Sequence, residues 1–315
     1  MSKFRCRRAR CIFSPAFYAG LRDANAGICV NYWCSKNSVS FFAIGPMVSL
    51  CVFISGCAAP PVEDAATICT DKSIGQVVQI FRQRRENVRP LRAGGSMRLE
   101  WYDSEDKKHE ENLNIDLRFC PPESIYFRGS SILGEVVRLG ANAQQFWVMI
   151  KPKEISTYQW GPRSRVERCS GRQWLNPGNL FEALGMLWID TGWSVSGDDD
   201  LQAMTKTSDR GNVVQKIYVG CNDYLARRIE YYDAEGQVAL VLKLDGYRPV
   251  GDAAPVPTRI NITHYETNIV ADIVLKNVKL FEPSPKQLTG LFTRPEPAGF
   301  EHVFKLNENC EFVEQ

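Results

Sequence analysis

Histidine is scarce in this sequence, and the usual local signatures of catalysis are missing. Its 315 residues include three histidines (His109, His264 and His302), no Cys-x-x-Cys pair and no Gly-x-Ser-x-Gly segment. A catalytic or metal site needs titratable groups that converge, and no motif here brings such groups together. A base and nucleophile pair of His264 with Cys120 or Cys221 is the alternative that the residues leave open. We expect a protein that is not an enzyme and that binds no cofactor and no metal.

An excess of basic residues is also missing from most of the chain. The formal net charge is +2, but residues 1–56 contain seven basic residues and one acidic residue, and so carry +6. Residues 57–315 are left with −4, which offers a phosphate backbone no attractive surface. We therefore expect no nucleic-acid partner.

The sequence has no apolar run long enough for a membrane helix. The longest uncharged stretch, Val39–Ile54, is interrupted by Gly45-Pro46 and is shorter than the roughly 20 residues that a span requires. Lys36 lies just before it, and small residues follow it. This order is typical of a secretory signal, so we interpret residues 1–56 as a leader and signal peptide, of which residues 1–38 could come from a misassigned start.

The signal segment ends in Ile54-Ser55-Gly56-Cys57, which resembles the bacterial lipobox. The resemblance implies that Cys57 is acylated, with chains such as palmitate, and becomes the new N-terminus. Two or more acyl chains give stable membrane anchoring. Ala58, where aspartate would retain a lipoprotein in the inner membrane, favours the outer membrane facing the periplasm. The five further cysteines allow one or two disulfides in such an oxidising compartment, with a pairing that the sequence does not fix; they are Cys69, Cys120, Cys169, Cys221 and Cys310.

Alternation of apolar and polar residues dominates the rest of the chain. Apolar spacing predicts a helix over residues 73–88, and Pro177 begins a second helix predicted over residues 176–187. Between and after these helices, alternating segments separated by turn residues predict about eleven strands, mostly antiparallel. The strands before residue 171 are predicted at 96–102, 111–119, 124–129, 135–140, 145–152, 155–160 and 164–169. We expect a mainly β, α+β protein, with a curved antiparallel sheet or half-open β-barrel and helices covering its concave side.

The same pattern gives the domain organisation. Residues 57–72 read as a lipidated tether, residues 73–306 as one domain, and residues 307–315 as a C-terminal tail. Residues 171–200, a helix followed by a loop, are expected to form a helical insertion over the mouth of the sheet.

Three stretches together resemble the LolA/LolB superfamily of periplasmic lipoprotein carriers. Asp116–Phe119 continues through Pro122 to Ile125–Phe127, Val137–Gly140 leads to Phe146–Val148, and Leu291–Pro295 is followed by Gly299. The resemblance implies an incomplete barrel, closed by helices, that holds acyl chains. One departure concerns Pro121, which stands where the carrier has a basic residue that latches its lid.

The resemblance implies that lipid or lipoprotein acyl chains bind in an apolar concavity, with a periplasmic carrier protein as a further partner. Alternation then selects the apolar residues that face this concavity as lipid-binding candidates: Ile115, Leu117, Phe119, Ile125, Phe127, Phe146, Val148, Leu240, Leu242, Ile260 and Ile262. An empty cavity and a filled core give the same alternation. A non-carrier envelope lipoprotein, such as a sensor or assembly module that binds a protein, therefore stays open as the alternative.

The family's outer-membrane acceptor also inserts an exposed apolar loop into the bilayer. The nearest equivalent in this sequence is Met186–Ile189, for which a helix end packed on the sheet is the alternative that we favour.

Overall fold

The computed structural model describes residues 72–315, apart from residues 104, 152–154, 169–175 and 199. The predicted signal segment, the lipobox with Cys57, and the tether up to residue 71 lie outside the described residues. None of the helices found in the described ranges has the length and apolar character needed to cross a membrane.

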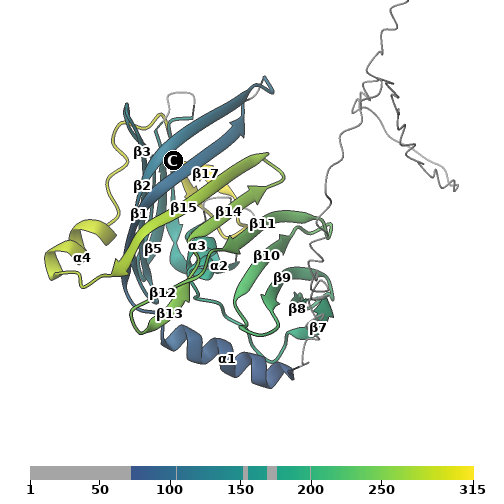
Figure 1. The fold of residues 1–315 in the computed structure, drawn as a ribbon. Helices are drawn as coiled ribbons and strands as arrows, with labels where there is room; N and C mark the ends of the chain where they lie inside the picture. The colour runs from purple at the N-terminus through teal and green to yellow at the C-terminus, as the bar shows by residue number, and fades with distance from the viewer. Residues whose placement is uncertain (1–71, 104, 152–154, 169–175, 199) are drawn as a thin grey trace, which may run out of the picture. The chain divides into compact units, whose positions relative to one another are not determined.

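A single antiparallel sheet of fifteen strands dominates the fold and curls around a concave inner face (Figure 1). Its strands follow the order β17-β16-β6-β5-β4-β3-β2-β1-β15-β14-β11-β10-β9-β8-β7, and only β16 and β6 pair in parallel within the described ranges. The first strands are β1 (Leu91–Tyr102), β2 (Lys108–Cys120), β3 (Ser124–Ser131), β4 (Gly134–Ala141), β5 (Gln145–Ile150), β6 (Thr157–Pro162), β7 (Ser194–Asp198) and β8 (Leu201–Thr207). The later strands are β9 (Val213–Gly220), β10 (Ala226–Tyr232), β11 (Val238–Asp245), β14 (Arg259–His264), β15 (Ile269–Leu280), β16 (His302–Leu306) and β17 (Phe312–Glu314), while β12 (Arg248–Val250) and β13 (Ala253–Val256) form a separate ribbon. The predicted mainly β architecture with a curved, open sheet is confirmed.

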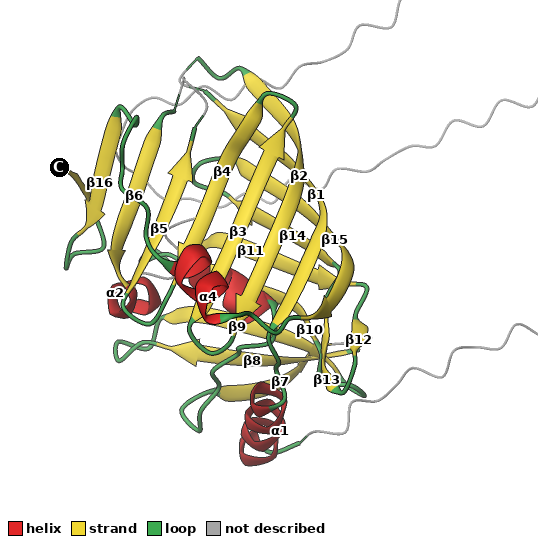
Figure 2. Ribbon diagram, turned by 90° about the vertical axis from the view of Figure 1, so that its left-hand side faces the viewer, coloured by secondary structure: helices red, strands yellow, loops and turns green. Residues whose placement is uncertain are grey.

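Four helices accompany the sheet in the described ranges: α1 (Ile74–Glu86), α2 (Arg163–Arg168), α3 (Pro177–Ala183) and α4 (Pro285–Phe292). Helix α1 begins after Ser73, which forms a capping box with Gln76. Helix α3 begins after Asn176, whose side-chain oxygen accepts a hydrogen bond from the Gly178 N–H at 2.7 Å. Figure 1 places α3 inside the curve of the sheet and α4 outside it, and Figure 2 shows α4 against the outer face.

Alternation along each strand decides which face of the sheet its side chains join. In β2, Leu113, Ile115, Leu117 and Phe119 are buried, whereas Asp116 and Arg118 between them are only partly buried. Successive side chains of a strand point to opposite faces, so the apolar set forms part of the inner face. The predicted orientation of this strand is therefore correct.

Helices α1 and α3 supply the groups that fill much of the inner face. Val77 and Phe81 of α1 and Phe181 of α3 belong to the same buried cluster as the inner-face strand residues. The Phe181 ring meets the Phe119 ring edge-on, with centroids 5.3 Å apart. At this end the concave side is a packed core.

The secondary structure differs from the prediction in several places, and the described ranges contain seventeen strands and four helices where about eleven strands and two helices were expected. Residues 163–168, expected as part of a strand, form α2, because this arginine-rich segment suits a helix at least as well as a strand. The expected loop after the second helix contains β7, and the expected tail contains β17. Both edge strands are short and weakly apolar, so pairing with a neighbour, rather than their own composition, makes them strands.

Candidate functional site

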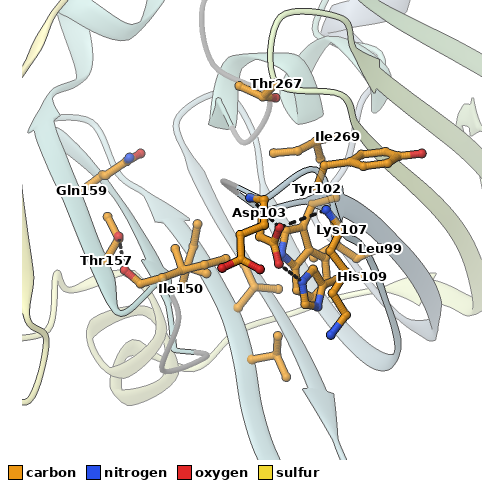
Figure 3. Close-up of a pocket in the computed structure, with 15 residues that line it drawn as sticks. Leu99, Tyr102, Asp103, Lys107, His109, Ile150, Thr157, Gln159, Thr267 and Ile269 are labelled. Atoms are coloured by element: carbon orange, nitrogen blue, oxygen red, sulfur yellow. Dashed lines mark hydrogen bonds and ion pairs between the residues drawn. The ribbon is translucent and has the colours of Figure 1, made fainter. Parts of the chain in front are cut away.

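A pocket of about 660 Å³ opens at one end of the concave face (Figure 3). The end of the β1–β2 hairpin, the turn between β14 and β15, and parts of β4, β5 and β6 surround it. Its lining consists of Leu99, Trp101, Tyr102, Asp103, Glu105, Lys107, His109, Val136, Val137, Ile150, Ile155, Thr157, Gln159, Thr267 and Ile269. Curling of the sheet brings β6 and β15, which have five strands between them in the sheet order, to the same pocket.

Aliphatic side chains provide the inner wall of this pocket. Val137 of β4 lies opposite Ile150 of β5 in the strand register, and Ile150 lies opposite Thr157 of β6. Leu99 of β1 and Ile269 of β15 contribute from the other side. These positions continue the same inner-face alternation that builds the packed core, but none of the residues that line the pocket belongs to a described helix.

Polar and charged groups lie at the mouth of the pocket, on the β1–β2 hairpin. The His109 Nε2 is 2.6 Å from the Asp103 Oδ2, and the imidazole ring stacks on Trp101 with centroids 5.3 Å apart. The hydrogen bond with His109, followed by hydrogen bonds from the backbone N–H groups of Lys107 and Glu105, lowers the pKa of Asp103. His109 therefore forms part of the mouth of the pocket.

A second histidine lies directly beside the pocket. His264 is almost completely buried, and its Nδ1 is 2.8 Å from the hydroxyl of Thr267, which lines the pocket. Its Nε2 has no hydrogen-bond partner among the described residues. Burial lowers the pKa of His264, so its neutral form is favoured.

A partly buried glutamate extends the polar groups along the same rim of the sheet. Glu182 of α3 accepts hydrogen bonds from the Tyr231 hydroxyl and, at 2.7 Å, from the Gln215 side-chain amide. Gln215 lies opposite Tyr231, Tyr231 opposite Leu240, and Leu240 opposite His264. Burial raises the pKa of Glu182 to about 7, and the hydrogen bonds from Tyr231 and Gln215 reduce that rise. The inner face is therefore apolar over most of its depth and polar along the rim where the pocket opens.

The eleven lipid-binding candidates from the sequence all lie in the packed core. Every one is buried and belongs to the main apolar cluster, and none lines the 660 Å³ pocket. Val148, for example, is one alternation step below Ile150 on β5. The role of these residues in binding acyl chains stays a prediction. The structure brings together residues that the candidate set left out, namely Leu99, Val137, Ile150 and Ile269. Extending the inner-face alternation by one or two steps toward the strand ends would have included them.

The alternative of a cysteine and histidine pair is not formed in the described ranges. Cys221 takes part in a disulfide, as does Cys310. Cys120 is a free thiol whose pKa is raised by burial, and alternation along β2 places it on the outer face, opposite to the face of His264. Neither cysteine presents a thiolate to His264.

The segment expected as the closest equivalent of a membrane loop is mostly packed against the core. Met186, Leu187 and Ile189 are buried, and only Trp188 is exposed, with the Arg85 guanidinium 3.6 Å from its ring centre. The packing that the favoured alternative expected is present, but the segment is not a helix end, because α3 stops at Ala183 and residues 186–189 form no regular structure.

The turn between β3 and β4 is the exposed apolar feature that the sequence analysis missed. Ile132 and Leu133 are 102% and 98% exposed. Val136 and Val137, just after this turn in β4, line the pocket, so the turn lies at the pocket end of the sheet. The sequence signal was two adjacent aliphatic residues in a position where a hairpin turn usually has polar ones.

Comparisons with known proteins address the fold. No protein-family model matches the chain, and no curated protein matches it significantly. Among solved structures, the LolA superfamily protein NE2245 from Nitrosomonas europaea is 12% identical, with 71% of this chain and 99% of that chain covered and a TM-score of 0.44. A DUF1329 family protein from Desulfovibrio piger is 10% identical, with 69% and 97% covered and a TM-score of 0.46. These likenesses are in fold alone.

Proposed function

We propose that this chain is a lipid-binding protein of the bacterial envelope that shelters acyl chains in the pocket at the open end of its sheet. The observation that carries the proposal is the pocket itself: about 660 Å³, with aliphatic inner walls and a polar mouth. This volume lies within the range of small-molecule sites, which are mostly apolar with a few orienting polar groups. The proposal assigns the protein no catalytic step.

An amphipathic ligand fits this distribution of groups. Leu99, Val137, Ile150 and Ile269 would contact the apolar chain, since burying each methylene in such surroundings is worth about 0.8 kcal/mol. Lys107 at the mouth makes no ion pair among the described residues and is available to a polar head. Phenylalanine and leucine residues deeper in the sheet would support this pocket without touching the ligand.

An oxidising compartment is supported by the disulfide state of two cysteines. Cys221 and Cys310 are both oxidised, and disulfides persist in exported proteins but are rare in the cytosol. Together with the signal pattern, this favours export to the envelope. We further propose that Cys57 is acylated and anchors the protein to the outer membrane, and that a periplasmic carrier could exchange ligand with it.

Cys57→Ala tests the anchor independently of the pocket. Acyl labelling should disappear and the protein should leave the membrane fraction, while the purified variant should still bind lipid. A variant that keeps its label would show that the acylated residue lies elsewhere.

The exposed turn offers a second, reversible contact with the bilayer. Ile132 and Leu133 stand next to each other, fully exposed, at the end of the sheet where the pocket opens. Insertion of two aliphatic side chains removes them from water, and it would bring the mouth of the pocket to the lipid surface. Lipid could then move between bilayer and pocket without crossing water.

Ile150→Trp is the sharpest test of the binding site. The indole should occupy pocket volume, so a fluorescent fatty acid should bind at least about tenfold more weakly, which corresponds to 1.4 kcal/mol. Leu288→Trp is the matched control, because Leu288 is an exposed residue of α4 outside the pocket. Native mass spectrometry of protein purified from its host should show co-purifying lipid in the parent and the control, but not in Ile150→Trp.

The alternative function is a non-carrier lipoprotein that binds a protein partner, and the packed state of most of the concave face favours it. A parent protein that carries no lipid and binds no fatty acid, with Ile150→Trp folded and unchanged, would overturn the lipid-binding proposal and leave this alternative.

A further inference from the structure

The outer face of the sheet carries a concentration of basic residues that the pocket does not use. We propose that this surface, the basic patch of Arg92, Arg118, Arg128, Arg138, Lys276 and Lys279, is a docking site for an acidic protein surface. It lies on β15, β1, β2, β3 and β4, on the face away from the pocket walls.

The strand register brings these side chains together in two rows. In the first row Lys279 lies opposite Arg92, and Arg92 lies opposite Arg118. The second row runs across five strands in the order Lys276, Gly94, Asp116, Arg128 and Arg138, each residue opposite the next. Its cations therefore lie at the two ends of the row, with Lys276 at one end and Arg128 and Arg138 at the other. Directly opposite residues on neighbouring antiparallel strands are about 5 Å apart, so Lys279, Arg92 and Arg118 are close neighbours in the first row, as are Arg128 and Arg138 in the second.

Acidic partners within the patch neutralise only part of this charge. Asp116 pairs with Arg118, and Glu135 pairs with Arg138 and, at 3.0 Å, with Lys151. The remaining four cations are exposed and make no ion pair with any described residue; they are Arg92, Arg128, Lys276 and Lys279. This local excess stands out because residues 57–315 together carry a formal net charge of −4.

Folding alone gives no reason for this arrangement. Like charges placed directly opposite each other in a sheet are destabilising, and the patch contains three such contacts: Lys279 with Arg92, Arg92 with Arg118, and Arg128 with Arg138. Farther along β1 and β2, outer-face charges alternate in sign. There Arg98 is 2.9 Å from Glu110, and Lys108 is 2.7 Å from Glu100. A partner with negative charge would turn the unfavourable contacts into favourable ones.

The position of the patch favours a protein over a bilayer as the occupant. Arg128 lies four residues from Ile132, about 13 Å along the strand at 3.3 Å per residue, and the row of Arg92 and Arg118 lies about two residues farther. With the Ile132–Leu133 turn at a bilayer, these charges would stand beyond the screening length of about 8 Å. Both rows also run across the strands, the direction in which the sheet curves (Figure 2), so a flat membrane could not contact a whole row.

Charge reversal tests the patch with a matched control. The double variant Arg92→Glu, Arg128→Glu reverses two patch cations, and Lys243→Glu, Arg248→Glu makes the same change at exposed cations on β11 and β12. A fluorescent poly-glutamate peptide should bind the parent and the control, with affinity that falls as salt rises, and should bind the patch variant about tenfold more weakly. Equal loss in both double variants would overturn the patch as the site.

Photocrosslinking in intact cells tests the class of occupant. A photoreactive residue placed at Lys279 should form protein adducts, and the double reversal at Arg92 and Arg128 should remove them. Adducts to lipid alone, or binding of the parent to phosphatidylglycerol vesicles through these same arginines, would overturn the protein-partner proposal in favour of a membrane. The Ile150→Trp variant should crosslink like the parent, which separates this proposal from the proposed lipid pocket.

Discussion

The two ends of the concave face are built from the same strands and the same alternation, yet one is packed and the other is open. At the packed end Phe119 of β2 meets Phe181 of α3, and both are almost completely buried. At the open end Val137 and Ile150 of the neighbouring strands line a pocket of about 660 Å³. The difference among the described residues is the position of α3: its Phe181 packs on Phe119, and none of its residues lines the pocket. Apolar alternation therefore builds a wall, and a separate element decides whether that wall becomes core or binding site.

The largest expected contrast comes from truncating one residue at each end. Phe119→Ala should lower the free energy of unfolding by about 3–5 kcal/mol, because it removes a buried ring and leaves a cavity against Phe181. Ile150→Ala should cost much less, about 1 kcal/mol, since its side chain already borders open space. Chemical denaturation of both variants measures this. Equal, large losses would mean that the pocket is closed in solution.

Glu182 of α3, which accepts hydrogen bonds from Tyr231 and Gln215, should make the free energy of unfolding depend on pH. Burial raises the pKa of Glu182 to about 7 from its ordinary value of 4.5, so between these values the folded protein keeps a proton that the unfolded chain releases. The free energy of unfolding should therefore fall as pH rises through this window, by about 3 kcal/mol in total. Glu182→Gln should lose this dependence and be more stable than the parent at pH 8.

Thermal unfolding at pH 5 and pH 8 measures this effect as the difference between parent and variant. His264 contributes the opposite slope, because burial lowers its pKa and the unfolded chain binds the extra proton at acid pH. Its contribution cancels in the difference. Glu235→Gln, in an exposed turn, is the control, and a variant profile parallel to the parent's would contradict the assignment.

Larger side chains on β5 can locate the boundary between the packed end and the open end of the concave face. Val148→Trp should destabilise the protein by about 1–3 kcal/mol, because Val148 is buried in the packed core. Ile150→Trp, one alternation step away, should fit into the pocket with little loss of stability while it blocks fatty-acid binding. Melting temperatures of both variants beside the binding assay test this. Similar destabilisation by both variants would mean that the packed core extends as far as Ile150.

The smallest effect on stability is expected at the exposed turn. Ile132→Asp with Leu133→Asp should change the free energy of unfolding by less than about 0.5 kcal/mol, since neither side chain is buried. Binding of an unacylated variant to vesicles, measured by co-sedimentation, should nevertheless fall. The control Ile132→Ser with Leu133→Ser should reduce binding less, because it adds no charge. Unchanged vesicle binding in both would remove the turn from the membrane contact.

Much of the fold could be predicted from local pattern. The alternation in residues 111–119 fixes which side chains of β2 face inward, and the spacing of Val77 and Phe81 fixes the packed side of α1. Ser73 and Asn176 mark the starts of two helices. These features depend on neighbours in the chain, so the sequence determines them by itself.

The site could not be predicted in the same way. Leu99, Ile150 and Ile269 come from strands far apart in sequence, and they meet only because the sheet curls and α3 stops short of them. The eleven candidates chosen by alternation are indistinguishable from these residues by composition alone. Likewise, Arg92, Arg118 and Lys279 form a patch only through strand register. The pairing of strands far apart in sequence and the position of α3 determine where the pocket, the core and the basic patch lie. A strand's own sequence specifies which side chains share a face, but not which other elements lie against that face.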